Sequence, residues 1–324
     1  MYHNQDNNFF HGVMFHHFHD DSIHKIGQGS ITSNQFEKII KFIGRENIIS
    51  AKNFIEKLSN NSLKNNEVCF TFDDGIRCQY DIALPILDKY DIKAFFFIYS
   101  SIFTNNPDLL EVYRYFRLNF FKNVNHFYDE FFSLVDKNLE NFFMKNKKII
   151  EEKKNKFPVY SYPDIKFRLV RDILLSKDDY KEIMEKLMKK KDFKKENYYE
   201  ILFMNKKMIK HLYSKGHEIG LHSHSHPTLL EALNEKDQYF EYKENYSLFK
   251  KIIGDKYNAK SMSHPCGSYN DETLKILNSM NIKIGFKSIM KIEKNKNMKK
   301  INNTYLEIAR DDHMNIINRM NKVL

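Results

Sequence analysis

The sequence predicts an α/β fold, a distorted (β/α) barrel of about seven parallel strands with a mostly helical insertion. First, short apolar stretches recur along the chain, and a segment with helical periodicity follows each of them, as in parallel strands joined by crossover helices. Second, about seven such units suit a barrel better than an open sheet, although the pattern alone leaves closure open. Third, hydrophobic residues make up 42% of the chain and aromatic residues 15%, which is enough for a large core.

Seven apolar stretches bounded by polar or turn residues are the expected strands. They are Gly12–His16, Val68–Asp73, Ala94–Tyr99, Glu218–His222, Ala259–Ser263, Ile282–Phe286 and Tyr305–Ala309. The expected helices are Ser33–Ile43, Ser50–Leu58, Tyr80–Tyr90, Met204–Ser214, Leu229–Ile253, Asp271–Met280 and His313–Lys322. Ser33 and Asn270 precede two of these amphipathic runs and are typical N-terminal capping residues.

Residues 101–200 interrupt this alternation. They contain no convincing strand, are rich in Phe, Tyr and Lys, and include helical stretches such as Asp178–Lys190. We expect a helical insertion within a single catalytic domain that spans residues 1–324. A structural cover and a lid over the substrate both remain open as its role.

The chain is basic, with 52 Lys and Arg against 42 Asp and Glu and a formal net charge of +10. Much of the excess lies in Lys145–Lys156, Lys189–Lys195 and Lys287–Lys300, among Asn, Glu, Ile and Phe. Such runs are typical of solvated helical faces, so no nucleic-acid partner is expected. An anionic substrate, such as a nucleotide- or lipid-linked sugar, is compatible with the positive field.

Features that report on cellular compartment favour a cytoplasmic protein. No apolar run approaches the roughly 20 residues of a membrane-spanning helix. Residues 1–12 lack the basic start and apolar region of a secretion signal. The three cysteines (Cys69, Cys78 and Cys266) cannot form a disulfide framework and fit a reducing compartment. The oligomeric state is not predicted.

The first chemical cluster is Phe70–Gly75, in which an apolar strand ends in two adjacent carboxylates, Asp73 and Asp74. Barrel strands present their C-terminal ends to the active face. Adjacent residues of an extended strand point apart, but a bend permitted by Gly75 could direct both carboxylates to one site. One could then bind a metal while the other acts as a base. A strand-end turn with solvated Asp residues is the alternative.

The second cluster is Gly216–Pro227, which places histidines at alternate positions 222, 224 and 226 after a short apolar strand. Imidazole is the commonest metal ligand, and catalytic zinc takes nitrogen and carboxylate ligands with one position open. His222 and His226 with one Asp would make such a set. The same set could hold iron, but a second, base-like Asp favours hydrolysis. Solvated surface histidines are the alternative.

The third cluster is Ser261–Asn270, where Pro265 and Gly267 force a tight loop between a strand and a helix. Backbone N–H groups in such a loop can point at a developing oxyanion. Ordinary strand–helix loops look similar, so this signal is weak by itself.

In this order the three clusters resemble the polysaccharide deacetylase family, the carbohydrate esterase family 4 group with a NodB-type domain. The matching motifs are Thr71–Gly75, His222-Ser223-x-x-His226 and Pro265–Gly267, with flanks at Ala83–Leu87, Ala94–Phe97 and Gly216–Gly220. The resemblance covers about residues 10–100 and 200–310 and leaves the insertion outside.

The resemblance implies a metal-dependent hydrolase that removes the N-acetyl group from an acetamido sugar or glycan precursor and releases acetate. By position Asp74, His222 and His226 would hold a divalent ion, most often Zn²⁺, with Co²⁺, Ni²⁺ or Mn²⁺ as alternatives. Asp73 would be the general base, and the backbone N–H of Cys266 would stabilise the oxyanion. His17 and Tyr269 are expected to contact the carbohydrate. O-deacetylation uses the same machinery and is not distinguished.

Two departures from the family pattern concern the third motif. Ser263 stands where the family usually has the Arg that holds the base carboxylate, and Cys266 stands where it has an aromatic residue. Arg310 is the expected substitute tether, with Arg77 as the alternative. The chain has no Trp, so the family's Trp-containing motif is absent.

The general acid has two main candidates. Many members use a His near the last strand, for which His313 is the nearest match. Val13–His17, however, resembles the first strand of the branch that deacetylates poly-N-acetylglucosamine, where a His after an aromatic residue is the acid. We therefore favour His16 over His313, with His17 and His264 behind.

Two other functions remain open from the sequence. One is an amidohydrolase acting on a non-sugar amide or a cyclic ureide. The other is a catalytically silent carbohydrate-binding module on the same scaffold. The apparently complete metal set argues against a metal-free amidohydrolase, and Asp73 argues against a silent module.

Overall fold

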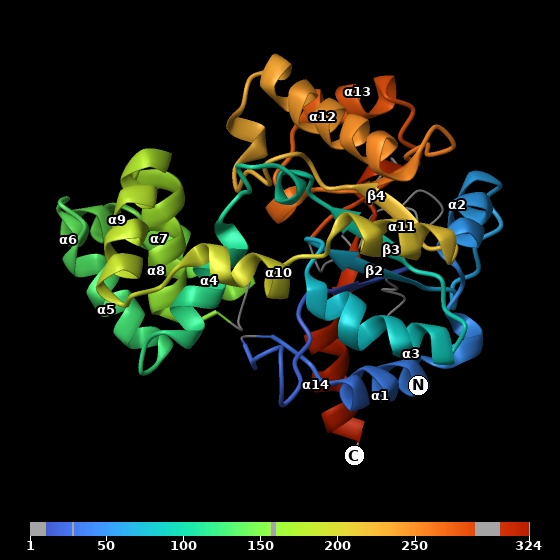
Figure 1. Cartoon of the computed structure of the whole chain (residues 1–324), viewed down its shortest axis with the longest axis horizontal. Coiled ribbons are helices and arrows are strands. Elements are labelled where there is room, and N and C mark those ends of the chain that lie inside the picture. Colours follow the sequence, from blue (N-terminus) through green and yellow to red (C-terminus); the bar gives the residue numbers. More distant parts are fainter. Residues whose placement is uncertain (1–10, 28, 157–159, 289–304, 324) are drawn as a thin grey trace. The chain divides into compact units, whose positions relative to one another are not determined.

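The computed structural model describes residues 11–27, 29–156, 160–288 and 305–323. The chain divides into two compact units, residues 1–108 with 200–324 (unit 1) and residues 109–199 (unit 2). Unit 1 contains the sheet and every candidate site residue, whereas unit 2 is helical (Figure 1). The N-terminal residues 1–10 and most of the lysine-rich segment 287–300 lie outside the described residues.

The sheet of unit 1 has seven strands in the order β6-β5-β4-β3-β2-β1-β7, all paired in parallel. They are β1 (Gly12–Phe15), β2 (Cys69–Asp73), β3 (Phe95–Ile98), β4 (Glu218–Leu221), β5 (Ser261–Ser263), β6 (Ile284–Phe286) and β7 (Arg310–Asp312). The two ends of the sheet also meet, because Phe286 at the end of β6 forms a parallel bridge with Ile308, just before β7. The Lys287 N–H donates to the Ile308 carbonyl at 2.8 Å. The sheet is thus a nearly closed barrel, which confirms the predicted fold class.

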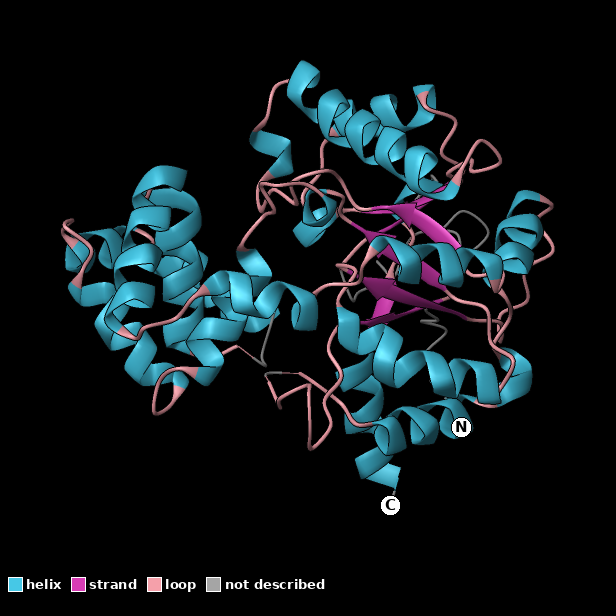
Figure 2. Ribbon diagram, viewed as in Figure 1, coloured by secondary structure: helices cyan, strands magenta, loops and turns pink. Residues whose placement is uncertain are grey.

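Helices of unit 1 surround the strands (Figure 2). They are α1 (Ser33–Ile43), α2 (Ala51–Ser59), α3 (Leu84–Lys89), α11 (Lys206–Ser214), α12 (Glu235–Ile253), α13 (Asp271–Ser279) and α14 (His313–Val323). The short α10 (Tyr199–Leu202) lies at the junction of the two units. Every helix among the described residues is too short or too polar to cross a lipid bilayer.

Local capping explains where the helices begin. A capping box at Thr32, rather than the expected Ser33, starts α1, and Asn270 forms the capping box of α13 as expected. Each such cap stabilises its helix by about 1 kcal/mol. The buried side of α1 (Phe36, Ile39, Ile40 and Ile43) has the spacing of an amphipathic helix packed on the barrel.

Side chains alternate in direction along each strand, and this alternation divides the apolar residues of the sheet between two cores. Phe70, Phe72, Phe96 and Ile98 belong to the large cluster that includes the surrounding helices. Cys69, Phe95, Phe97 and Phe286 belong to a second cluster. Since successive strand residues point to opposite faces, the second cluster fills the barrel interior. Thr71 and Asp73 are two and four residues after Cys69 in β2, so their side chains point to the same face and also lie inside the barrel.

The predicted last strand, Tyr305–Ala309, was wrong. Tyr305–Glu307 is a 3₁₀ turn, and the strand follows it as Arg310–Asp312. Three consecutive charged residues do not look like a buried strand in sequence. They are accommodated here because Arg310 pairs with Asp73 and Asp311 pairs with Arg319.

Two predicted helices were correct only in part. The segment 80–90 starts as a π-helical turn, Gln79–Ala83, before α3. The segment 229–253 starts with a 3₁₀ turn, Leu230–Ala232, and α12 begins only after the Asn234 cap. In both cases apolar residues that suggested helical periodicity belong to turns at the C-terminal face of the barrel.

Unit 2 consists of helices around an aromatic core. They are α4 (Leu110–Asn119), α5 (Val124–Ser133), α6 (Leu139–Lys145), α7 (Lys147–Lys156), α8 (Tyr162–Leu169) and α9 (Lys177–Lys190). Within the core, buried Asp164 accepts hydrogen bonds from Arg168 at 3.0 Å and Tyr128 at 2.8 Å, and Arg117 lies 3.5 Å away. Unit 2 therefore buries its own core and its own ion cluster. The role of the insertion, cover or lid, stays a prediction.

Candidate active site

Strand register brings the first two candidate residues together. The β1–β2 register pairs Met14 with Thr71 and Phe15 with Phe72, so the next residues, His16 and Asp73, come opposite each other at the strand ends. The His16 Nε2 lies 3.9 Å from an Asp73 carboxylate oxygen. Both side chains point toward the barrel interior, so an imidazole and a carboxylate meet at the C-terminal mouth of the barrel.

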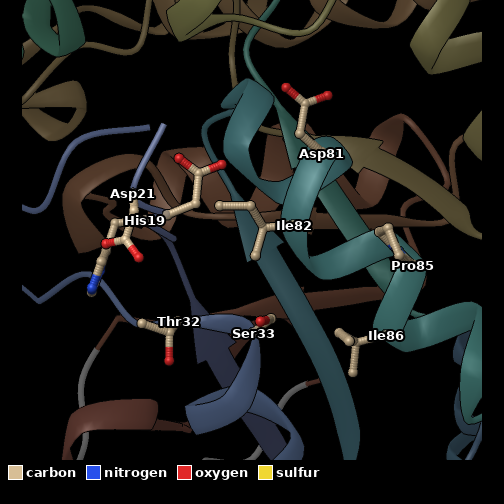
Figure 3. A pocket seen from close by; sticks show the side chains of 9 residues that line it. His19, Asp21, Thr32, Ser33, Asp81, Ile82, Pro85 and Ile86 are labelled. Atoms are coloured by element: carbon tan, nitrogen blue, oxygen red, sulfur yellow. The ribbon is translucent and has the colours of Figure 1, made fainter. Parts of the chain in front are cut away.

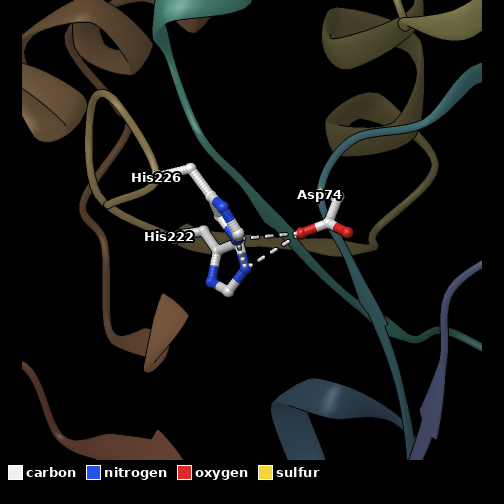
Figure 4. A group of neighbouring side chains, drawn as sticks. All are labelled: Asp74, His222 and His226. Carbon is white, nitrogen blue, oxygen red and sulfur yellow. Dashed lines mark hydrogen bonds and ion pairs between the residues drawn. The ribbon is translucent and has the colours of Figure 1, made fainter. Parts of the chain in front are cut away.

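Asp74, His222 and His226 converge on one point beside Asp73 (Figure 4). The Nε2 atoms of both histidines lie 3.2 Å from the same Asp74 oxygen, Oδ1. The two Nε2 atoms are also 3.2 Å apart. Three potential ligand atoms thus form a nearly equilateral triangle, and both histidines are buried.

This triangle fits a divalent ion. Tetrahedral zinc with bonds of about 2.0–2.1 Å separates neighbouring ligand atoms by about 3.3–3.4 Å, close to the observed sides. The His222 Nδ1 lies 2.8 Å from the Ser263 carbonyl oxygen, which can only accept a hydrogen bond. His222 is therefore protonated on Nδ1, and the Nε2 that faces Asp74 has its lone pair available for a metal.

Strained backbone positions aim these side chains. Asp74, Ser223, His226 and Cys266 have positive φ angles of 78°, 64°, 51° and 52°. The other non-glycine residues with positive φ among the described residues are Asn or Asp, which tolerate this conformation more readily. Positive φ at Asp74, Ser223 and His226, within the two segments that form the triangle, is typical of a functional site.

Gly75 makes the turn after Asp74 feasible. Its φ is 68°, and a Cβ at this position would lie 2.5 Å from a methyl group of Ile98. Only glycine fits both constraints, so the bend that the sequence suggested at this position is present.

Buried polar residues of α12 hold the loop that carries the histidines. Asn245 accepts a hydrogen bond from the His222 backbone N–H at 2.9 Å and donates to the Ile98 carbonyl at 3.0 Å. Glu241 accepts hydrogen bonds from the backbone N–H groups of His224 and Ser225 and from the Ser225 hydroxyl, at 2.6–2.8 Å. The loop between His222 and His226 is therefore fixed to one turn of a helix.

Arg310 holds the Asp73 carboxylate. Its two terminal nitrogens donate to the two oxygens of Asp73, each at 2.7 Å, and both side chains are buried. Ser263 joins the same network, since its hydroxyl donates to Asp73 at 3.2 Å and accepts from Arg310 at 2.9 Å. Arg310 thus takes the place left open by Ser263, whereas Arg77 pairs with Asp81.

The electrostatic surroundings keep both carboxylates ionised. Burial by itself raises the pKa of Asp73, but the charge and hydrogen bonds of Arg310 outweigh it and hold that pKa below its ordinary value. Burial likewise opposes ionisation of Asp74, yet the close contacts with His222 and His226 hold its pKa well below the usual range. The site therefore presents one tethered carboxylate and one carboxylate directed at two imidazoles.

The histidine candidates for the acid differ in their surroundings. His16 is partly exposed and lies near Asp73. The ring nitrogens of His313 lie 3.1 Å and 2.8 Å from the carbonyls of Met14 and Gly29, so both are engaged by the backbone. His264 is buried with a pKa of about 3, lowered mainly by burial, and its Nε2 lies 2.8 Å from the Leu306 carbonyl. These contacts favour His16.

The remaining predicted residues lie around this centre. The His17 ring stacks on His16 at 6.2 Å. Cys266 occupies the 3₁₀ turn Pro265–Gly267 with its side chain exposed. The Tyr269 hydroxyl donates to Glu307 at 2.7 Å, and its ring stacks on His264 at 4.2 Å. The contribution of these three residues to catalysis or to substrate binding stays a prediction.

A cavity of about 390 Å³ lies apart from this group (Figure 3). It is open to solvent and lies between the loop after β1, the start of α1 and the segment from the π-helical turn into α3. Its lining includes His19, Asp21, Thr32, Asp81 and Ile86. None of the lining residues belongs to the Asp–His–His triangle or to the Asp73–Arg310 pair. The chemistry is therefore assigned to the barrel mouth and not to this cavity.

Motif-based reasoning missed three supporting residues, Asn245, Glu241 and Gln79. The Gln79 side-chain amide donates to the backbone carbonyls of His16 and Asp73, at 3.0 Å and 2.6 Å, and so joins the ends of β1 and β2. No local pattern marks these residues, because their partners are 6 to 147 positions away in the chain.

Comparison with known families identifies the scaffold. The polysaccharide deacetylase family model matches residues 60–167 and 178–285, so the chain belongs to the polysaccharide deacetylase family. The match reaches into residues 101–200, which the motif resemblance had left outside. No curated protein sequence matches the chain. Family membership supports a hydrolytic carbohydrate deacetylase.

Solved structures of similar fold span nearly the whole chain. The Streptococcus pyogenes deacetylase PplD, in complex with acetate, is 18% identical and has a TM-score of 0.53, with 97% of this chain and 98% of that chain covered. IcaB from Ammonifex degensii is 12% identical with a TM-score of 0.53, covering 94% and 91%. A de-N-acetylase from Aggregatibacter actinomycetemcomitans is 12% identical with a TM-score of 0.54, covering 96% and 98%. At these identities the likeness shows a shared fold.

Proposed function

We propose that this protein is a metal-dependent hydrolase that removes the acetyl group from an N-acetylated sugar and releases acetate. The observation that carries the proposal is the 3.2 Å triangle of Asp74, His222 and His226 directly beside the Asp73–Arg310 pair. Membership of the polysaccharide deacetylase family and the likeness in fold to a de-N-acetylase support it. A nucleotide- or lipid-linked sugar as substrate and a cytoplasmic location stay predictions.

Each residue has a defined task in this proposal. Asp74, His222 and His226 would hold the ion, which supplies Lewis-acid polarisation of the acetamido carbonyl and of a water molecule. Asp73 is ionised and fixed by Arg310, so one of its oxygens can accept the proton of the attacking water. His16 is partly exposed at the mouth of the barrel and would donate a proton to the departing amine.

The spacing of acid and base suits hydrolysis of an amide. An amine leaves poorly unless it is protonated as the C–N bond breaks, which requires an acid as well as a base. With His16 and Asp73 only 3.9 Å apart, both groups can reach one reacting centre. A silent binding module has no use for a buried carboxylate kept ionised by a bidentate Arg, so the geometry favours catalysis.

Metal content and acetate release test the proposal together. The wild-type protein without a histidine tag should bind about one zinc-class ion per chain by elemental mass spectrometry. Asp74→Ala should lose it, because one corner of the triangle is removed. Asp73→Asn should retain the ion but release no acetate from N-acetylglucosamine oligomers, because only the base is gone.

Two results would contradict the proposal. Full activity of Asp73→Asn would show that this carboxylate is not the base. A wild-type protein that binds no zinc, cobalt or nickel would favour a metal-free amidohydrolase. His222→Ala should also lose the ion, whereas His126→Ala should retain it and is the matched control, because His126 is exposed and lies in unit 2.

A further inference from the structure

Large exposed apolar side chains of unit 1 gather at one end of the barrel. Among the described residues of this unit they are Ile23, Ile26, Leu229, Tyr239 and Phe240. The first three lie in loops that follow β1 and β4, and the last two lie near the start of α12. All of these segments follow the C-terminal ends of strands, which is the end that carries the Asp–His–His triangle.

Phe240 has the most direct connection to the triangle. Its ring makes an edge-to-face contact with the His224 ring, at a centroid distance of 6.0 Å and an interplanar angle of 80°. His224 lies between His222 and His226 in the chain, so its Cα is within about 8 Å of the Cα of each metal-site histidine. Phe240 is 54% exposed, and it is one of the exposed apolar side chains at this end of the barrel.

The position of this ring is fixed by the same contacts that fix the triangle. The next residue, Glu241, accepts the hydrogen bonds that hold His224 and Ser225. The His224 Nδ1 lies 2.9 Å from the Ser100 hydroxyl at the end of β3. Phe240 therefore has a rigid relation to the metal site, as a preorganised recognition surface requires.

We infer that Phe240 is a stacking platform for the sugar residue adjacent to the one that is deacetylated. A pyranose ring has an apolar face of C–H groups that packs on an aromatic ring, and an edge-to-face contact with His224 leaves at least one face of Phe240 uncovered. This inference rests on the proposed function and extends it. It adds Phe240, a residue outside the Asp–His–His triangle, as a determinant of how tightly the neighbouring sugar is held.

Steady-state kinetics give the first test. With oligomers of β-1,4- or β-1,6-linked N-acetylglucosamine, Phe240→Ala should raise KM about tenfold, the effect of one aromatic contact, while kcat stays within about twofold. Phe240→Tyr should behave as wild type, whereas Phe240→Leu, which keeps an apolar side chain of similar size, should resemble Phe240→Ala. An unchanged KM for Phe240→Ala, or full function of Phe240→Leu, would overturn the platform.

The absence of Trp from the chain provides a binding test that does not depend on turnover. In the Asp73→Asn background, Phe240→Trp introduces a single indole, whose emission should change when either oligomer is added. Tyr239→Trp is the matched control, because Tyr239 is also exposed but its side chain points about 100° away around α12. A silent indole at 240, or equal responses at 239 and 240, would overturn the inference.

The two tests separate this inference from the proposed function. Acetate release by the wild type with a silent indole at 240 would leave the deacetylase in place and remove the platform. An indole response without acetate release by the wild type would support a carbohydrate platform and overturn the deacetylase.

Discussion

The Asp73–Arg310 pair gives the most demanding prediction, because both charges are buried and each is satisfied mainly by the other. Arg310→Met removes two hydrogen bonds of 2.7 Å and leaves a carboxylate without its counter-charge in the barrel. Breaking a buried pair from one side costs about 3–5 kcal/mol of unfolding free energy. Asp73→Asn leaves the buried Arg310 guanidinium without its counter-charge, although an amide oxygen still accepts one hydrogen bond, so this variant should lose stability as well.

The double variant distinguishes pairing from general disruption of the core. When Arg310→Met and Asp73→Asn are combined, no uncompensated charge remains, so the loss should be smaller than the sum of the two single losses by about 2 kcal/mol or more. Urea unfolding followed by circular dichroism measures each member of this cycle. Additivity within about 0.5 kcal/mol would refute the reasoning.

Metal content and a surface pair serve as controls for this cycle. Arg310 contacts Asp73, Thr71, Ser263 and the Lys287 carbonyl but none of the three triangle residues, so Arg310→Met should retain its metal. Its deacetylase activity should fall about 100-fold or more, because the base is no longer oriented. The exposed Lys89–Glu37 pair, at 3.0 Å, should show no measurable coupling in the same kind of cycle.

Three further predictions concern residues around the barrel. Gly12→Ala should destabilise unit 1 by about 1–3 kcal/mol and reduce activity, because the added Cβ would lie 2.8 Å from the Arg310 Cγ. A Gly12→Ala variant with the activity and the urea unfolding midpoint of the wild type would contradict this prediction. Glu241→Gln should weaken zinc binding about 10- to 100-fold in a chelator competition, because the loop between His222 and His226 loses the carboxylate that holds it. Zinc affinity equal to that of the wild type would show that Glu241 does not support the zinc site. Burial raises the pKa of Glu218 from 4.5 to about 7, so the unfolding free energy should fall as pH rises from about 4.5 to 7, by up to about 3 kcal/mol. Glu218→Gln should therefore stabilise the protein at pH 8 and not at pH 4, and an equal effect at both values would exclude this cause.

Much of the barrel was predictable because its signals are local. Strands buried on both faces are short apolar runs, and caps such as Asn270 mark helix starts within three or four residues. The metal-site residues were equally accessible, since Asp73-Asp74-Gly75 and His222-x-x-x-His226 each lie within five positions at the end of a strand.

The last strand and the supporting residues were harder for the same physical reason. Arg310–Asp312 is a strand only because β1 pairs with it and distant side chains neutralise its charges. Asn245 and Glu241 look like ordinary residues of a long helix until α12 is placed against the His222–His226 loop.

The sequence by itself determined the class of fold, the adjacent carboxylates and the spaced histidines, because strand ends and short motifs are properties of neighbouring residues. The sequence named Arg310 and Arg77 as candidate tethers of Asp73, and only the tertiary structure decided between them by placing Arg310, 237 positions away, on that carboxylate. Only the tertiary structure also shows that Phe240 packs against the loop between His222 and His226. Hydrogen bonds and ring contacts act over a few ångströms in space. Closure of the barrel brings those partners together, and no pattern along the chain records which distant residues become neighbours.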